Sequence, residues 1–360
     1  MADKIFLSIV CAVVCIFSAE VSAAENIRVA IADNRKTVLL TSGSGLEVEG
    51  DLSGAQEKRM TFAAASLGGR PMRIRSAGDF IRVNNKSYRG CVELRRKKNG
   101  LILVINDLDI EEYLKGVIAS EIPHDWEFEA LKAQAVASRT YALYQKRSAG
   151  HRPYHILATV NSQVYNGGDG ERRNAVRAVK DTKGLVIVYH GEVIPAFYHS
   201  SCGGHTENAE EFWGIDEPYL KGVDCECQEI SKYGLWEKRV SIAKVATALR
   251  RIGYRLNTFE DLTIASLTPA GRVKSVAIRS AGKMKQIPGE TLRTALGNTV
   301  ILSSFFELEL IDGEAVFSGR GSGHGVGLCQ WGAQEMAQRG SDFRSILSHY
   351  YPGTSLARMK

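Results

Sequence analysis

The sequence lacks the features that mark several large classes of protein. Its 360 residues contain no internal repeat and no low-complexity tract, which excludes repeat and collagen-like architectures. The main apolar run, residues 5–19, is shorter than the stretch of about 20 residues that a membrane-spanning helix needs. Hydrophobic residues at 44% and charged residues at 24% are ordinary globular values. The chain is long enough for one large or two moderate domains, each with its own core.

The N-terminus predicts export. Lys4 precedes the apolar run, and the small residues Val21-Ser-Ala23 are typical of the site before a signal-peptidase cut. We therefore expect residues 1–23 to be a removable signal peptide. A retained anchor is the weaker alternative, because Glu20 and Glu25 flank the run where basic residues would be expected. The net charge of +6 favours an anionic partner, such as a wall polymer, a nucleic acid or a membrane surface.

The distribution of apolar residues predicts an α+β fold. Short β-branched runs separated by turn residues fill residues 26–110, and an alanine-rich segment over 126–146 then predicts a buried helix capped by Asp125. We expect a β-rich N-terminal region over 24–85 and a mixed α/β body over 86–355. Polar side chains at helical spacing from Gln134 to Gln145 would give the helix one face that could line a cleft.

Five ordered motifs carry the strongest signal. They are Tyr113-Leu-x-Gly-Val-x-x-x-Glu121-x-Pro123, Ala130-Leu-Lys-Ala-Gln-Ala-Val-Ala-x-Arg139-Thr-Tyr141, Gln163-x-Tyr165-x-Gly167, Tyr198-His199-Ser-Ser-Cys-Gly-Gly-x-Thr206-Glu and Gly319-Arg-Gly-x-Gly-His324-Gly-Val-Gly-x-x-Gln330-Trp-Gly-Ala333. Each is weak alone. Together, from about residue 85 to 355, they resemble the SpoIID/LytB family, the stage II sporulation protein D type of cell-wall enzyme.

The resemblance implies a lytic transglycosylase that cleaves MurNAc–GlcNAc links of peptidoglycan, in strands freed of stem peptides, with Glu121 as the catalytic acid. A single glutamate suffices there, because the C6 hydroxyl of MurNAc attacks its own anomeric carbon and leaves 1,6-anhydro-MurNAc ends. An ordinary glycosidase needs a second carboxylate. Ile122, Pro123 and Trp126 would supply the apolar surround that keeps the acid protonated at neutral pH. The alternative is a non-catalytic glycan-binding enhancer of a cell-wall amidase.

Further residues of the five motifs are candidates for binding the glycan. These are His324, Gln330, Arg139, Tyr141, Gln163, Tyr165 and His199. Arg139 and Tyr141 lie in the packed helix, which favours structural roles for both. Five glycines surround His324, and we expect them to let sugar lie against bare backbone. The partners implied are peptidoglycan strands and, for an enhancer, an amidase. We expect no nucleic acid, and a periplasmic or extracellular location at the cell wall.

The cysteines leave two interpretations open. Removing the signal segment leaves five, Cys91, Cys202, Cys225, Cys227 and Cys329, and an odd number cannot pair completely within one chain. Some relatives of the sporulation type hold zinc through His and Cys before the Gln-x-Tyr motif, but here that interval contains only histidines. In an exported protein we expect a disulfide from Cys202 to Cys225 or Cys227, and no cofactor. Zinc held by His199, Cys202, His205 and Cys225 is the weaker alternative.

Overall fold

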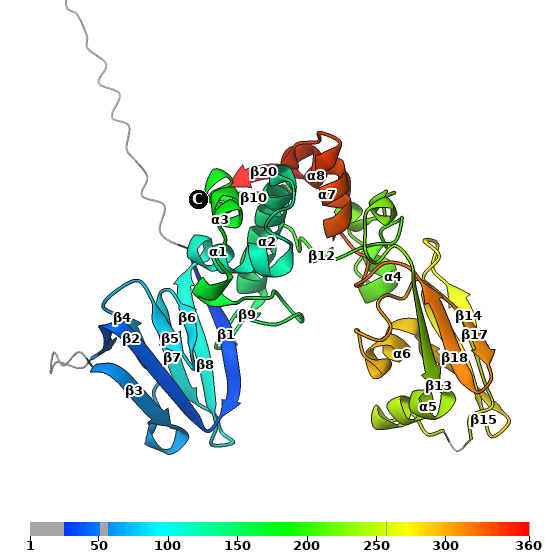
Figure 1. The fold of residues 1–360 in the computed structure, drawn as a ribbon, viewed down its shortest axis with the longest axis horizontal. Helices are drawn as coiled ribbons and strands as arrows, with labels where there is room; N and C mark the ends of the chain where they lie inside the picture. Colours follow the sequence, from blue (N-terminus) through cyan, green and yellow to red (C-terminus); the bar gives the residue numbers. More distant parts are fainter. Residues whose placement is uncertain (1–24, 51–56, 257, 360) are drawn as a thin grey trace, which may run out of the picture.

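The molecule has the shape of an arch. The computed structural model describes residues 25–50, 57–256 and 258–359; the predicted signal peptide lies outside these residues. An N-terminal β-sheet forms one leg, a mixed α/β unit forms the other, and a helical layer joins them at the top (Figure 1). The α+β prediction is therefore confirmed. Within the described ranges, no helix has both the length and the apolar character required to cross a bilayer.

The N-terminal leg is a nine-stranded sheet with the order β6-β5-β2-β4-β7-β8-β1-β9, in which β3 pairs with β2. Its strands are β1 (Asn26–Arg35), β2 (Thr37–Val48), β3 (Glu57–Ala63), β4 (Met72–Ser76), β5 (Ile81–Val83), β6 (Lys86–Tyr88), β7 (Cys91–Arg96), β8 (Ile102–Asp109) and β9 (Ile156–Leu157). The predicted domain boundary at residue 85 falls within this sheet. Beyond that residue, β7 and β8 continue the sheet and pair with each other through six residue pairs. The continuous run of sheet strands β1 to β8 ends at Asp109, and the first helix begins at the next residue.

Two helices connect the sheet to the rest of the molecule. Helix α1 (Ile110–Glu121) is capped by Asp109, whose side chain accepts from the amides of Glu111 and Glu112. Helix α2 (Phe128–Ser148) is the predicted alanine-rich helix, and twelve of its residues are buried. It begins after Glu127, so the expected cap at Asp125 is wrong. Small side chains on opposite faces of α2 pack into two different cores, one with the sheet and one with the C-terminal helices.

The central layer brings distant parts of the chain together. Its elements are α3 (Arg173–Asp181), β10 (Leu185–Tyr189), β11 (Glu192–Val193), β12 (Tyr198–His199), α4 (Ala209–Trp213), β19 (Leu328–Cys329), α7 (Gln330–Gln338), α8 (Phe343–Tyr350) and β20 (Ser355–Arg358). Strand β12 pairs in parallel with β19, so the fourth and fifth motifs lie side by side. Strand β10 pairs with β20 and β11 and packs on α2.

The second leg is a unit with its own hydrophobic core. It consists of β13 (Trp236–Ser241), α5 (Ile242–Arg251), β14 (Asp261–Leu267), β15 (Val273–Ser280), β16 (Lys283–Pro288), α6 (Gly289–Leu296), β17 (Phe306–Ile311) and β18 (Glu314–Gly319). These strands form two three-stranded antiparallel sheets, and α5 and α6 pack beside them (Figure 1). The predicted body over 86–355 therefore contains this separate unit, inserted between the fourth and fifth motifs.

A buried ion pair ties the central layer to α1. The guanidinium of Arg139 is fully buried and donates two hydrogen bonds of 2.8 Å to the carboxylate of Glu111. It also donates to the carbonyl oxygens of Val179 and Leu185, at the ends of α3 and β10. All its polar contacts are thus internal, and the candidate role of Arg139 in glycan binding gives way to a structural one.

Arg139→Met should lower the free energy of unfolding by about 3–5 kcal/mol, because it leaves the buried Glu111 carboxylate without its partner. The matched control is Arg147→Met on the same helix, where the side chain is half exposed and its pair with Glu192 is long at 3.6 Å. Chemical denaturation of both variants measures the difference. Equal stability of the two, with glycan binding lost only in Arg139→Met, would return Arg139 to the substrate site.

Candidate active site

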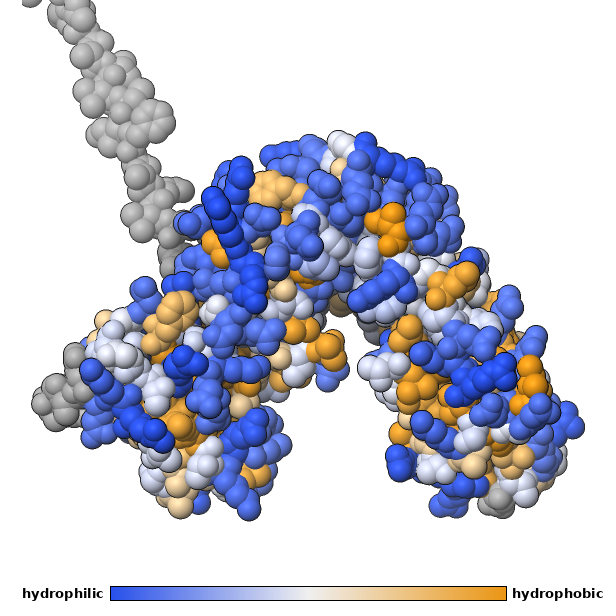
Figure 2. All heavy atoms as spheres, viewed as in Figure 1, coloured by the Kyte–Doolittle hydropathy of each residue, from blue (hydrophilic) through white to orange (hydrophobic). Residues whose placement is uncertain are grey.

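A cleft of about 850 Å³ brings residues of all five motifs together. It lies on the inner side of the arch, whose hollow is visible between the legs in Figure 2. One wall comes from the end of α1 and the loop after β9, and the other from α4 and α6. Among the predicted site residues, the cleft is lined by Glu121, Tyr141, His199, His324 and Gln330. A cleft bounded by both legs and open to solvent can accept an extended chain.

The end of α1 fixes the position of Glu121. Glu121 is the last residue of the helix, and Ile122 has extended backbone angles (φ −135°, ψ 155°) because Pro123 follows it. One carboxylate oxygen of Glu121 accepts a hydrogen bond from the amide of Val164 at 2.5 Å. The Glu-x-Pro spacing of the first motif thus stops the helix and leaves the carboxyl at its C-terminal end, within the cleft.

Burial raises the pKa of Glu121 to about 7. Three hydrogen bonds to its carboxylate, from the Val164 amide and the side chains of Tyr198 and Gln330, oppose this change in part. The negative end of the α1 dipole also disfavours a charge at this position. None of the three residues expected to form an apolar surround, Ile122, Pro123 and Trp126, lines the cleft. Trp126 packs on Trp331 instead, with ring centroids 4.8 Å apart. The carboxyl is nevertheless set to carry a proton near neutral pH.

Gln163 and Tyr165 lie behind the cleft rather than in it. Gln163 is fully buried and accepts from the hydroxyl of Tyr113 at 3.0 Å. Its amide donates to the hydroxyl oxygen of Tyr198 at 3.1 Å, which leaves the Tyr198 proton free to point toward Glu121. Tyr165 is buried, and its hydroxyl donates to Asn106 in the sheet. Gln163 is therefore a positioning residue, and Tyr165 is part of the packing beneath the site.

The two histidines in the cleft are both neutral, because burial lowers the pKa of His324 to about 3 and that of His199 well below its usual value. His324 donates from Nε2 to the carbonyl of Tyr198 at 2.9 Å and accepts at Nδ1 from the amide of Val326. Both of its ring nitrogens are thus occupied by backbone groups. His199 donates from Nδ1 to the carbonyl of Val326 at 3.1 Å, so its Nε2 is a lone-pair acceptor. In the described structure this buried Nε2 has no hydrogen-bond partner.

The glycines around His324 serve chain packing. A Cβ atom at Gly327, where φ is +70°, would lie 2.2 Å from the carbonyl oxygen of Phe197. One at Gly323, where φ is +107°, would lie 2.8 Å from the Cβ of His199. The glycines let the fifth motif lie directly against the fourth, whereas we had expected them to receive sugar. Of the five glycines around His324, only Gly323 lines the cleft.

Sequence reasoning missed the aromatic wall of the cleft. Phe197, Phe212 and Trp213 line it together with Tyr141, and the Trp213 ring lies 5.0 Å from that of His324. Trp213 is 41% exposed although it is large and apolar, which is typical of a binding surface. Only the pair Phe212-Trp213 beside two glutamates hinted at this. Glu290 and Arg293 of α6 reach the cleft from the second leg, and no motif marked them.

Four cysteines lie together, and this group is neither the predicted disulfide pair nor the alternative zinc set. The sulfur atoms of Cys202, Cys225, Cys227 and Cys329 all lie within 4.8 Å of one another, and all four are free thiols here. Of the alternative zinc set, only Cys202 and Cys225 belong to this group, because the His199 ring is in the cleft and His205 faces Asp224. Cys202 and Cys227 have sulfurs 3.4 Å apart, so a disulfide between them stays a prediction.

Comparison with known proteins identifies the family. Residues 98–189 match the family model SpoIID, described as stage II sporulation protein, and residues 207–327 match a domain of unknown function (DUF8618). Stage II sporulation protein D of Bacillus subtilis is 31% identical over an alignment of 270 residues, which covers 70% of this chain and 76% of that protein. The chain belongs to the stage II sporulation protein D family.

Two further relatives match a similar share of this chain. An uncharacterised protein of Brachyspira hyodysenteriae is 36% identical over 262 residues, which are 72% of this chain and 69% of that protein. The amidase enhancer of Bacillus subtilis is 31% identical over an alignment of 288 residues, which covers 68% of this chain and 40% of the enhancer. The match thus spans less than half of the enhancer's length.

Glu121→Gln should change how stability depends on pH. Because folding raises the pKa of Glu121 from 4.5 to about 7, the carboxyl stabilises the fold below pH 4.5, and this contribution is lost as pH rises through 7. Relative to wild type, Glu121→Gln should gain on the order of 2–3 kcal/mol between pH 4.5 and pH 8.5. Urea denaturation at both pH values measures this gain. Glu112→Gln on the same helix is the control. If the free energy of unfolding of Glu121→Gln changed with pH as much as that of the wild type, the pKa of Glu121 would lie near its ordinary value.

Proposed function

We propose that this chain is a lytic transglycosylase that cleaves MurNAc–GlcNAc links in peptidoglycan, with Glu121 as its single acid and base. The observation that carries the proposal is the Glu121 carboxyl, which lines the cleft where the family motifs meet and whose pKa burial raises to about 7. Membership of the stage II sporulation protein D family supports the same conclusion. We further propose that the protein acts outside the cytoplasm, where this polymer lies.

The first step needs a proton donor. In the protonated state Glu121 gives its proton to the glycosidic oxygen, the C1–O bond breaks, and positive charge develops on the MurNAc ring. The carboxylate left on Glu121 is stabilised by the Val164 amide and by the side chains of Tyr198 and Gln330. These donors favour the charged form, so they stabilise the state that follows proton transfer.

The second step returns the proton to Glu121. The C6 hydroxyl of MurNAc attacks C1 while the carboxylate takes its proton, which closes the 1,6-anhydro ring and restores the acid. Burial, rather than a neighbouring carboxylate, raises the pKa of Glu121. Glu290 also lines the cleft, and burial raises its pKa as well. One of its oxygens accepts from Arg293 at 2.7 Å, and the other has no hydrogen-bond partner among the described residues. The mechanism with one catalytic carboxyl therefore rests on the resemblance of Glu121 to the family motif, and the Glu290 variant below tests it.

The aromatic side chains of the cleft suit a sugar polymer. Phe197, Phe212, Trp213 and Tyr141 offer ring faces, onto which the C–H faces of pyranose rings pack. His199 adds a buried acceptor nitrogen with no partner in the described structure. An unpaired buried acceptor costs about 1–3 kcal/mol, and a sugar hydroxyl or acetamido N–H that donates to it would recover that cost.

A non-catalytic enhancer of an amidase is the second candidate, because one relative carries that name. Glycan binding by the cleft would serve both functions. The raised pKa of Glu121 favours the enzyme, since a binding module has no use for a carboxyl kept protonated at a stability cost. Strands freed of stem peptides are the proposed substrate, and comparison of amidase-treated with intact peptidoglycan tests this choice.

Amidase-treated peptidoglycan should release fragments that end in 1,6-anhydro-MurNAc, and Glu121→Gln should reduce the release by at least about 10³-fold, because the amide cannot donate the proton. Mass spectrometry of the products measures both. Glu112→Gln should retain activity. Glu290→Gln should still give anhydro ends, whereas reducing MurNAc ends that vanish in Glu290→Gln would indicate a two-carboxylate hydrolase.

Two substitutions of His199 separate its two nitrogens. His199→Asn can keep the bond to the Val326 carbonyl but removes the acceptor at Nε2, whereas His199→Gln places an acceptor near Nε2 and loses the backbone bond. We expect His199→Asn to weaken glycan binding about 5–20-fold with little loss of stability. His199→Gln should show the reverse, measured by calorimetry and thermal unfolding. Equal glycan affinity in the two variants would assign His199 a purely structural role.

A further inference from the structure

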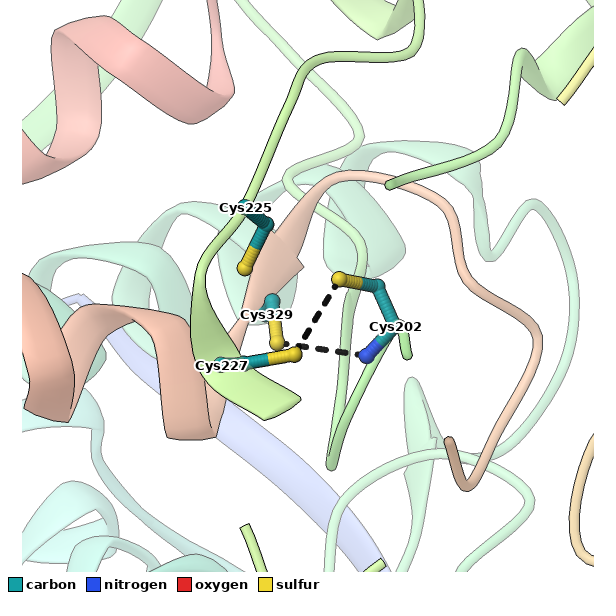
Figure 3. A group of neighbouring side chains, drawn as sticks. All are labelled: Cys202, Cys225, Cys227 and Cys329. Carbon is teal, nitrogen blue, oxygen red and sulfur yellow. Dashed lines mark hydrogen bonds between the residues drawn. The ribbon is translucent and has the colours of Figure 1, made fainter. Parts of the chain in front are cut away.

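Four buried thiols converge from three separate segments of the central layer. Cys202 lies in the loop after β12, Cys225 and Cys227 lie at the start of the 3-10 turn η4 (Cys227–Glu229), and Cys329 ends β19. Their exposed fractions are 0% for Cys202, Cys227 and Cys329 and 7% for Cys225. Figure 3 shows the four sulfur atoms pointing toward one common centre. Nothing in the proposed glycan chemistry uses them.

The spacing of the sulfurs fits a single ion. A tetrahedral zinc with Zn–S bonds of about 2.3 Å separates its sulfurs by about 3.8 Å. The longest sulfur separation here is within 4.8 Å, and that between Cys202 and Cys227 is 3.4 Å. An iron–sulfur cluster places several irons and sulfides among its cysteines and so needs a wider ring of thiols. The cluster is therefore of the size for one four-coordinate metal.

The surroundings are suited to thiolates. The backbone amides of Cys202 and Gly332 both point at the sulfur of Cys329, each at 3.3 Å. Cys329 is also the N-cap of α7, where the positive end of the helix dipole favours a negative charge. The hydroxyl of Tyr350 lies 3.2 Å from the sulfur of Cys225. Such donors orient thiolate ligands and offset their charge in structural metal sites.

A buried cation lies next to the same group. Arg272 is 1% exposed, and its guanidinium donates to the carbonyl oxygens of Cys202 and His205 at 2.6 and 3.3 Å. Four thiolates around a divalent ion carry a net charge of −2, which would be costly to bury without compensation. The buried carboxylate of Glu207 lies 4.0 Å from the same guanidinium, so Arg272 is shared between that carboxylate and the cysteine group.

We propose that Cys202, Cys225, Cys227 and Cys329 bind one structural zinc ion. Zinc is the metal that closed tetrahedral sites of four cysteines hold without redox chemistry. Binding would join the segment after His199 to the residue before Gln330, and so fix two walls of the cleft through a site outside it. The ligand set differs from the alternative that the sequence offered, because both histidines of that alternative lie elsewhere. The proposal does not depend on the proposed function.

Purified protein should contain about one zinc ion per chain by elemental analysis, with X-ray absorption showing four sulfur ligands at about 2.3 Å. Cys227→Ser and Cys329→Ser should each lose most of the zinc. Cys91→Ser is the control and should keep it, because Cys91 lies in β7 of the distant sheet. Removing the ion with a strong chelator should lower the melting temperature of the wild-type protein, and added zinc should restore it.

Measurements on the wild-type protein keep the test decisive if the serine variants fail to fold. Peptide mapping without reductant, on protein purified after export, distinguishes thiolates from disulfides. A disulfide from Cys202 to Cys225 or Cys227 with no stoichiometric metal would overturn the proposal, as would four free thiols without metal. Iron in place of zinc, recognised by its visible absorption, would overturn the identity of the ion.

Discussion

The desolvation of one carboxyl at the end of a helix is the constraint around which the site is built. Pro123 ends α1 at Glu121, and the burial of the carboxyl limits its contact with water. A charged carboxylate there would be poorly solvated and would face the negative helix end, so the proton is retained to a pKa of about 7. The donors that surround it, from Val164, Tyr198 and Gln330, come from three other motifs, which explains why the motifs occur together.

The remaining family motifs act mainly through packing. Arg139 joins α1, α2, α3 and β10 around one buried charge pair, and Gln163 sets the direction of the Tyr198 hydroxyl. The glycines of the last motif let β19 lie against β12. Most of the motif residues therefore hold a small number of side chains in place. Those that reach the cleft with free groups are few.

Local patterns predicted the fold class and the alanine-rich helix, because short periodicities act within a few residues, whereas Glu121 was singled out by the resemblance to the family. They failed where the outcome depends on distant segments. The end of the continuous run of strands at Asp109 depends on the pairing of β8 with β1. In the sequence, these two strands are separated by β2 to β7. The amide of Cys202 contacts the sulfur of Cys329, although the two residues are 127 positions apart in the sequence. No rule of motif spacing connects residues that far apart. The aromatic wall and the unit that contributes α6 are likewise products of tertiary structure.

The central claim is that a sugar hydroxyl, and not water, completes the cleavage at Glu121. Digestion of amidase-treated peptidoglycan in water enriched in oxygen-18, followed by mass spectrometry of the released termini, tests it directly. The account predicts anhydro termini that carry no label, because every oxygen in them comes from the glycan. Reducing termini that carry one labelled oxygen would show that water attacks the anomeric carbon, and would contradict it.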